Sequence, residues 1–69
     1  MNKETLGQRL KSLREEKGLT QIQMALQLQI DKSTIAKYET DKVEPSLSMF
    51  KTLVLFFGTT ADYLLGLED

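Results

Sequence analysis

Apolar residues along this chain recur at spacings of three and four, as on one face of an amphipathic α-helix, and they do not alternate as in a strand. Glycine and proline interrupt the pattern and divide the chain into five segments. The pattern therefore predicts an all-α protein that forms a single domain over residues 1–69. The expected helices span residues 5–17, 20–28, 31–40, 47–57 and 60–65.

Several of these boundaries are marked by residues that can satisfy the free N–H groups of a first helical turn. Thr5 and Gln8 have the spacing of a capping box. Thr20 and Gln23 repeat that spacing at the second segment. Asp31 is expected to cap the third helix, where its charge also suits the helix N-terminus.

Apolar side chains at helical spacing predict one small core. On the first segment, Leu6, Leu10 and Leu13 form a single stripe. The polar face of that helix is expected to carry Arg9, Lys11, Glu15 and Glu16. The core residues expected from the later segments are Ile22, Met24, Leu28, Leu47, Phe50, Leu53, Val54, Phe57, Tyr63 and Leu64.

The fourth segment is more apolar than one small core can use. Residues 53–57 are five consecutive apolar residues, and a helix cannot turn all of them toward the same side. Some of this surface should therefore be exposed or covered by another subunit. We expect Leu55, Phe56 and Leu67 to form the contact of a homodimer.

The composition excludes several kinds of chemistry. The chain has no cysteine and no histidine, which removes disulfides, thiolate or imidazole metal sites and Cys–His or Ser–His nucleophile pairs. We therefore expect no enzymatic activity, no metal and no cofactor. No apolar run approaches the roughly 18 residues of a membrane span, and the first residues lack the apolar stretch of a signal peptide. These features predict a cytoplasmic protein with no membrane partner.

Charge is nearly balanced over the whole chain but unevenly distributed along it. Nine basic and ten acidic residues give a net charge of −1, which is not typical of a nucleic-acid binder. However, residues 1–17 carry five positive and three negative charges, whereas residues 61–69 carry three negative charges and no positive one. Part of the acidic charge is thus concentrated at the C-terminal end.

The second and third segments are two short helices joined by a turn of about three or four residues, the arrangement of a helix-turn-helix over residues 20–40. In that motif the second helix, here about residues 31–40, can enter the major groove of DNA. Ala25 is small where the two helices would pass closely. The inward positions of the turn and the third helix are Ile30, Ile35 and Tyr38. The opposite face of that helix then carries Lys32, Ser33, Ala36 and Lys37.

Several short pieces of sequence occur together along this chain. They are Leu19-Thr20-Gln21, Ala25, Ser33-Thr34-Ile35, Tyr38-Glu39, Pro45-Ser46-Leu47 and Asp62-Tyr63-Leu64-Leu65-Gly66. In this combination the chain, from Leu6 to Gly66, resembles the phage-repressor helix-turn-helix family, also described as Cro/lambda-repressor or XRE-type. The resemblance implies a compact five-helix DNA-binding domain, encoded by a bacterium or a phage and associated with the nucleoid when bound.

The resemblance also implies which residues contact DNA. In the family, the first residues of the third helix and one residue a turn later face base edges, which corresponds to Lys32, Ser33 and Lys37 here. Lysine can donate to guanine O6 and N7, and serine can serve either base type. The implied contacts to the DNA backbone are Gln21, Thr20, Thr34, Thr40, Lys42 and Ser46. A structural ion pair is implied between Arg14 and Glu39.

Taken one at a time, these residues have simpler interpretations. Lys32, Lys37 and Lys42 are typical of an ordinary solvated face, and Gln21 of an exposed helix surface. Ser33 is typical of the start of a helix. The combination of motifs favours contact with DNA.

At two turn positions where resembling sequences usually carry glycine, this chain has Gln29 and Asp41. A left-handed backbone at Gln29 would cost about 1 kcal/mol, whereas aspartate tolerates this conformation better than most residues. We expect these departures to affect the loops and not the fold.

Together these features predict a sequence-specific transcriptional regulator that binds double-stranded DNA, repressor-like and homodimeric on an operator with two related half-sites. The alternative is a protein-interaction module on the same fold, antitoxin-like or anti-repressor-like, that uses the apolar surface of the last two helices. The slight excess of acidic residues favours this alternative, as do Asp31, Asp41 and Glu44 beside the proposed DNA face.

Overall fold

The computed structural model describes residues 4–68 and contains five α-helices within that range. They are α1 (Leu6–Glu16), α2 (Gln21–Leu28), α3 (Lys32–Glu39), α4 (Leu47–Phe57) and α5 (Ala61–Leu64). Each begins and ends within one residue of its predicted range, and the described residues form no strand, so the all-α prediction is confirmed. The longest helices have 11 residues, and none in the described range is long and apolar enough to cross a membrane.

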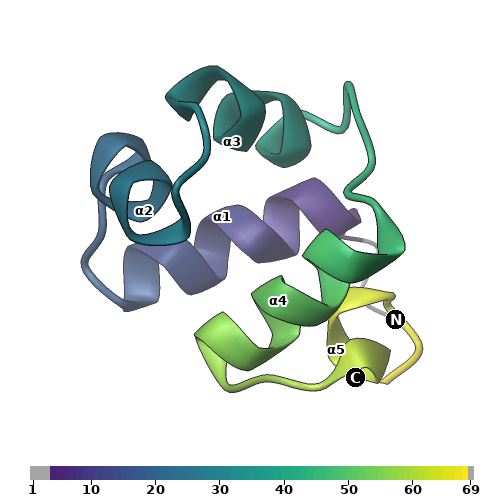
Figure 1. Ribbon diagram of the computed structural model, residues 1–69. Helices are drawn as coiled ribbons and strands as arrows, with labels where there is room; N and C mark the ends of the chain where they lie inside the picture. The colour runs from purple at the N-terminus through teal and green to yellow at the C-terminus, as the bar shows by residue number, and fades with distance from the viewer. Residues whose placement is uncertain (1–3, 69) are drawn as a thin grey trace.

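Helix α1 crosses the centre of the molecule and separates the other helices into two groups (Figure 1). Helices α2 and α3 lie on one side of α1, with α3 along the outer edge, and they contact each other. Helices α4 and α5 lie on the other side and also contact each other. Because α1 packs against both α3 and α5, it links the two groups.

The two capping boxes predicted from the sequence are present. The Thr5 hydroxyl accepts the backbone N–H of Gln8 at 3.1 Å, and the Gln8 side chain accepts the backbone N–H of Thr5 at 2.8 Å. Thr20 and Gln23 form the same pair of hydrogen bonds, at 3.1 and 2.8 Å, before α2. These reciprocal bonds satisfy donors that a first turn leaves free, so local residues define where both helices begin.

Asp31 occupies the N-cap position of α3, but the prediction that its side chain caps the helix is wrong. The usual target of such a cap is the N–H of the third helical residue, here Thr34. That N–H donates instead to the backbone carbonyl of Asp31 at 3.0 Å. The carboxylate is therefore not needed to satisfy it, and the exposed Asp31 side chain only adds negative charge at the start of α3.

The core is built from all five helices. Its fully buried apolar residues are Leu10, Met24, Ala25, Ile35, Leu53 and Leu64. The half-buried residues that pack around them include Leu28, Phe50, Val54, Phe57 and Tyr63. Most of the predicted core is therefore confirmed, either as fully buried or as half-buried side chains.

Two residues expected in the core are exposed, Ile22 by 57% and Leu47 by 84%. Helix α2 carries apolar residues on more than one side, and its buried side is that of Met24 and Ala25. Ile22 lies on the outer face together with Leu26, one turn away. Leu47 is the first residue of α4, at one end of a helix that is buried near its middle. Periodicity alone does not show which side of such an apolar helix faces the core.

Arg9 does not lie on the polar face of α1, as the sequence predicts, but is only 1% exposed. It is three residues from Leu6 and four from Leu13, so its stem lies beside the apolar stripe. Its guanidinium carbon is 4.7 Å from the centroid of the Tyr63 ring, a cation–π contact between α1 and α5. Among the described residues, its buried Nε and Nη1 atoms have no hydrogen-bond partner. Stacking on Tyr63 therefore replaces part of the hydration that this cation loses.

Candidate nucleic-acid interface

The turn of the helix-turn-helix contains a left-handed residue at Gln29, a position where resembling sequences usually carry glycine. Gln29 has φ 59° and ψ 43°, and the N–H of Ile30 donates to the carbonyl of Ala25 at 3.0 Å. This pattern is that of a Schellman motif, which ends α2 and turns the chain toward α3. Because glycine favours such a conformation and glutamine does not, the turn retains a strain of about 1 kcal/mol.

Helix α3 has one exposed and one buried side. Lys32, Ser33 and Lys37 are exposed. Ile35 and Glu39 are buried against the rest of the protein. Because α3 lies along the outer edge, away from α4 and α5, its exposed side faces outward (Figure 1). The structure therefore brings the three residues predicted to contact bases onto one outward side.

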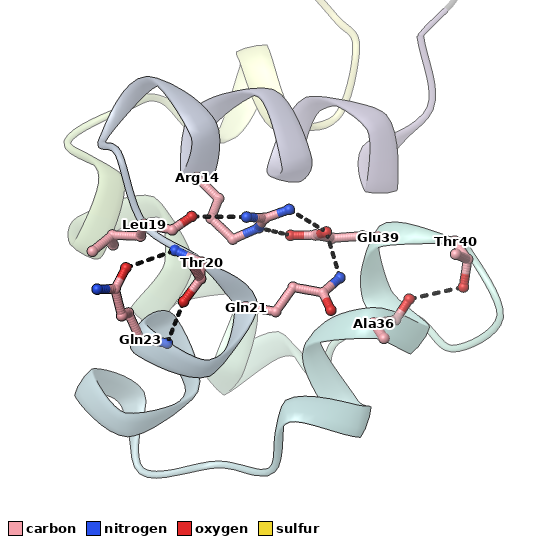
Figure 2. A network of polar contacts seen from close by, with 8 residues as sticks. All are labelled: Arg14, Leu19, Thr20, Gln21, Gln23, Ala36, Glu39 and Thr40. Carbon is pink, nitrogen blue, oxygen red and sulfur yellow. Dashed lines mark hydrogen bonds and ion pairs between the residues drawn. The ribbon is translucent and has the colours of Figure 1, made fainter.

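A polar network joins α1 and α2 to the buried side of α3 (Figure 2). The predicted ion pair is present, since Arg14 Nε lies 2.6 Å from Glu39 Oε2 and Arg14 Nη2 donates to Glu39 Oε1 at 3.1 Å. Arg14 Nη1 also donates to the carbonyl of Leu19 at 2.7 Å. Gln21, the first residue of α2, donates from Nε2 to Glu39 Oε1 at 3.0 Å. One carboxylate at the end of α3 therefore holds that helix against both α1 and α2.

The ion pair of Arg14 and Glu39 is shielded from water, with 8% and 7% of the two residues exposed. Hydrogen bonding to Glu39 raises the pKa of the Arg14 guanidinium, and this outweighs the opposite effect of burial. Arg14 therefore stays charged throughout the physiological pH range. Because both oxygens of Glu39 accept from Arg14, removing one partner leaves a buried charge uncompensated, at a cost of about 3–5 kcal/mol.

Gly7 also helps to position α3. A Cβ atom at this residue would lie 2.5 Å from the carbonyl oxygens of both Tyr38 and Glu39. Real side chains essentially never come that close, so glycine is what lets α1 approach the end of α3. The signal in the sequence is a glycine inside a predicted helix, where it lowers stability unless packing requires it.

Asp41, the second residue at a position where resembling sequences usually carry glycine, forms hydrogen bonds to the start of α1. Its backbone is left-handed, with φ 61°. Its Oδ1 atom accepts the N–H of Gly7 at 2.9 Å, and its Oδ2 atom accepts the hydroxyl of Thr5 at 2.5 Å. The carboxylate thus lies at the N-terminus of α1, where the helix dipole favours negative charge. A side chain that glycine lacks therefore joins the loop after α3 to the start of α1.

The hydroxyl groups predicted to contact the DNA backbone also have partners within the protein. Thr20 and Ser46 are N-cap residues whose oxygens accept a backbone N–H of the following helix, each at 3.1 Å. An accepting hydroxyl keeps its own proton, so Thr20 can still donate to a phosphate. The Ser46 Oγ also lies 3.3 Å from the Ser48 Oγ and either of them can be the donor, so the Ser46 proton is available to a phosphate when Ser48 donates. The Thr40 hydroxyl instead donates to a carbonyl one turn earlier in α3, at 2.8 Å (Figure 2). Lys42 is exposed and Thr34 is half-buried.

Helix α4 and the residues that follow α5 leave apolar surface exposed. Leu55 and Leu67 are each 71% exposed, as the sequence predicts, and Leu65 is also exposed. We refer to these three residues as the exposed leucines. Phe56 differs, because it is half-buried against the core, and the Lys17 amine lies 5.3 Å from its ring centroid. The expectation that Phe56 is surplus surface is therefore corrected, since its own chain covers part of it.

Comparison with known proteins agrees with this architecture. A family model described as "Helix-turn-helix domain" matches residues 7–69. The chain is 36% identical over 64 residues to the immunity repressor protein of Bacillus phage phi105, covering 93% of this chain and 44% of that protein. It is 39% identical over 62 residues to the HTH-type transcriptional activator BcrR of Enterococcus faecalis, covering 90% and 30%. The HTH-type transcriptional regulator ImmR of Bacillus subtilis (strain 168) is 34% identical over 65 residues, covering 94% and 51%.

The chain thus spans between 30% and 51% of the length of these relatives. Among solved structures, it is similar to the crystal structure of the P22 c2 repressor protein in complex with synthetic operator 9T in the presence of Tl+, with a TM-score of 0.85. The two chains are 20% identical, and the match covers 94% of this chain and 98% of the other, which shows a common fold. By its family model, its relatives and its fold, the chain belongs to the helix-turn-helix domain family, of the phage-repressor, XRE type.

Proposed function

We propose that this domain is a sequence-specific, repressor-like transcriptional regulator that places α3 in the major groove of double-stranded DNA. One observation carries the proposal. Lys32, Ser33 and Lys37 share the outward side of α3, while the buried ion pair holds the end of the same helix in place. A reading helix needs both features, because base discrimination requires donors at fixed positions. The relatives include proteins named as a repressor, an activator and a regulator, which supports a role in transcription.

The base contacts are assigned to three side chains. Lys32 and Lys37 can each donate to O6 and N7 of guanine, and Ser33 can serve either base type. The two lysines are five residues apart, about 7.5 Å along the helix axis, so they can reach different base pairs. A half-site that contains more than one guanine is therefore the expected target.

Contacts to the DNA backbone would orient α3 within the groove. Gln21 is at the N-terminus of α2, where free N–H groups and the helix dipole favour a phosphate. Its Nε2 atom carries two protons and donates one of them to Glu39, so the other can be donated to a phosphate. Thr40 would have to exchange its hydrogen bond within α3 for one to DNA. The full set of proposed backbone contacts is Gln21, Thr20, Thr34, Thr40, Lys42 and Ser46.

The domain is proposed to act as a homodimer on an operator with two related half-sites. One module with two or three base contacts, each contributing about 1–3 kcal/mol, gives limited discrimination, and a second half-site doubles it. The net charge of −1 increases this need, because it weakens general attraction to phosphates. The exposed leucines, with the accessible part of Phe56, supply apolar surface for the dimer contact.

The variant Leu55→Gln tests the dimer, because this side chain is exposed in the single chain. We expect the variant to stay folded, to sediment as a monomer and to lose cooperative binding to a full operator, whose half-sites lie about 34 Å apart. Lys51→Gln, a change at another exposed residue of α4, is the control and should leave the dimer intact. A Leu55→Gln protein that still sediments as a dimer would move the contact to another surface.

The proposed role is not catalytic and uses neither a metal nor a cofactor. The lack of cysteine and histidine supports this, because it removes thiolate and imidazole ligands and Cys–His or Ser–His nucleophile pairs. The proposed location is the cytoplasm of a bacterium, where chromosomal and phage DNA are accessible. Relatives from Bacillus subtilis, Enterococcus faecalis and a Bacillus phage support that setting.

The alternative function is a protein-interaction module, antitoxin-like or anti-repressor-like, that uses the surface of α4 and α5. The exposure of Leu55 and Leu67 favours it. The acidic residues near α3 favour it less than the sequence suggests, because the Asp41 carboxylate is engaged at the start of α1. Asp31 and Glu44 are exposed and could still repel DNA or attract a basic partner.

A salt titration with a random-sequence duplex separates the two functions. Binding to DNA releases counterions from the phosphates, so we expect the affinity to fall steeply as the salt concentration rises. Lys42→Ala should reduce the slope of this dependence by about 1, and Lys51→Ala on α4 should leave it unchanged. Absent binding, or binding that does not respond to salt, would contradict the proposal and favour the protein-interaction module.

A further inference from the structure

Ala36 places a methyl group within the outward side of α3. It follows Lys32 by four residues and Ser33 by three, so it is next to both on the helix surface, and Lys37 comes directly after it. The residue is half-buried. Its carbonyl accepts two hydrogen bonds from Thr40, from the N–H at 3.1 Å and from the hydroxyl at 2.8 Å (Figure 2). The residue therefore offers an apolar side chain, and its backbone acceptor is already engaged.

A methyl group among base-reading side chains is selective because it forms no hydrogen bonds. All four bases present donors or acceptors along their major-groove edges, but only thymine also presents a 5-methyl group there, beside its O4 acceptor. Contact of a methyl group with such an atom removes its water without replacing the lost hydrogen bond, which is unfavourable. The 5-methyl group of thymine is apolar, so its contact with another methyl group removes apolar surface from water and is favourable.

We infer that Ala36 is a specificity-determining residue that contacts the 5-methyl group of a pyrimidine in the major groove. Thymine carries this group, and cytosine carries it only when methylated. The inference rests on the proposed function, since it requires α3 to lie in the groove. It adds a preference that Lys32, Ser33 and Lys37 do not supply, namely a thymine beside a guanine that one of the lysines contacts.

The size of residue 36 also restricts the contact. An alanine side chain extends one carbon from the backbone, so the methyl groups meet only if α3 comes close to the bases at this point. Lysine side chains are long and reach base edges from further away. Alanine is also the best helix former, and its presence here could serve the helix alone. In that case methyl groups on the DNA would have no effect on affinity.

The experiment uses a preferred duplex selected from a random-sequence pool. Each thymine of that duplex is replaced in turn by deoxyuridine, which lacks only the 5-methyl group. We expect about fourfold weaker binding at one thymine in each half-site, the effect of removing one buried methyl group. At the same position, a cytosine should bind more weakly than a 5-methylcytosine, which separates the methyl group from the rest of the thymine base.

Two alanine-to-glycine variants assign the effect to residue 36. Ala36→Gly should bind the thymine and deoxyuridine duplexes equally. Ala61→Gly makes the same change in α5, on the other side of α1, and should retain the fourfold difference (Figure 1). Thermal melts show whether each variant is folded at the temperature of the assay. If Ala36→Gly is unfolded at that temperature, Ala36→Ser replaces it in the binding assay. The serine hydroxyl should also remove the preference for the methyl group.

Three results would overturn the inference. Sequence-specific binding without any thymine at which deoxyuridine weakens it would leave the proposed function intact and remove the role of Ala36. A thymine preference that persists in Ala36→Gly would assign the methyl contact to another residue. Absence of specific DNA binding would overturn the proposed function and this inference together. A preference that is present in the parent and in Ala61→Gly but lost in Ala36→Gly supports it.

Discussion

The two sides of α1 are held together in different ways. On the side of α2 and α3, the contacts are directional, because Glu39 accepts hydrogen bonds from both Arg14 and Gln21. Asp41 accepts two further hydrogen bonds at the start of α1. On the side of α4 and α5, the packing is mainly apolar and includes the fully buried Leu53.

This difference agrees with what each side is proposed to do. Hydrogen bonds fix distances and angles, so they suit a helix that presents side chains to base edges in one register. Apolar packing is non-directional and tolerates a change of shape at constant volume, so it suits a surface that a second subunit completes. Conservative changes should therefore be tolerated better on the side of α4 and α5.

Replacement of Glu39 by alanine should have the largest effect. It leaves the buried Arg14 charge without its partner, which costs about 3–5 kcal/mol. That loss is comparable to the whole stability of a domain of this size. Glu44→Ala, which removes an exposed carboxylate, should change stability by less than about 0.5 kcal/mol. Urea denaturation measures both values, and equal stabilities for the two variants would show that the ion pair does not hold α3.

Alanine at Gly7 should lower the free energy of unfolding by about 1–3 kcal/mol, because the added Cβ pushes α1 away from the end of α3. This loss should appear although alanine favours a helix over glycine by about 1 kcal/mol. Lys11→Ala, at an exposed position of α1, should be nearly neutral in the same thermal melts. A Gly7→Ala protein more stable than the parent would mean that the two helices can separate at no cost.

On the apolar side, Leu53→Met should cost less than about 1.5 kcal/mol, because it nearly conserves volume. Leu53→Ala, which leaves a cavity at a fully buried position, should cost about 2–5 kcal/mol. Denaturant unfolding of the two variants measures how specific the packing is. If Leu53→Met lowers the free energy of unfolding as much as Leu53→Ala does, the packing around α4 requires as specific a geometry as the polar network.

The smallest expected effect is a gain. Gln29→Gly should raise stability by about 1 kcal/mol, because glycine adopts the left-handed backbone of the turn without strain. Gln27→Gly, two residues earlier inside α2, should instead lose about 1 kcal/mol. Melting temperatures of the two variants should therefore move in opposite directions. An unchanged or lowered melting temperature for Gln29→Gly would mean that the glutamine side chain stabilises the turn.

What could be predicted from the sequence depends on how local each feature is. The capping boxes that begin at Thr5 and Thr20 need only residues three apart, so both helix starts were predictable. Periodicity does not show which side of an apolar helix is buried, so the sequence wrongly places Ile22 in the core. The bond between Gly7 and Asp41 joins residues 34 apart in sequence, and no periodicity indicates it.

The residues of the candidate site likewise differ in whether the sequence alone predicts their contacts. The lysines of α3 could be placed on one side from their spacing, and the pair of Arg14 and Glu39 followed from the family resemblance. The bond from Gln21 to Glu39 depends on how α2 and α3 cross, so it appears only in the folded chain. Burial of Arg9 likewise needs the Tyr63 ring from the far end of the sequence.

The role of α3 is tested most directly by the affinity of lysine variants for two kinds of DNA. Lys32→Ala and Lys37→Ala are each titrated at one salt concentration against the preferred duplex and a random-sequence duplex, with Lys51→Ala on α4 as the control. If the two lysines contact base edges, each variant should lose about 1–3 kcal/mol on the preferred duplex and less on random DNA, while the control changes neither. Equal losses on both duplexes would make these lysines phosphate contacts and would contradict base reading by α3.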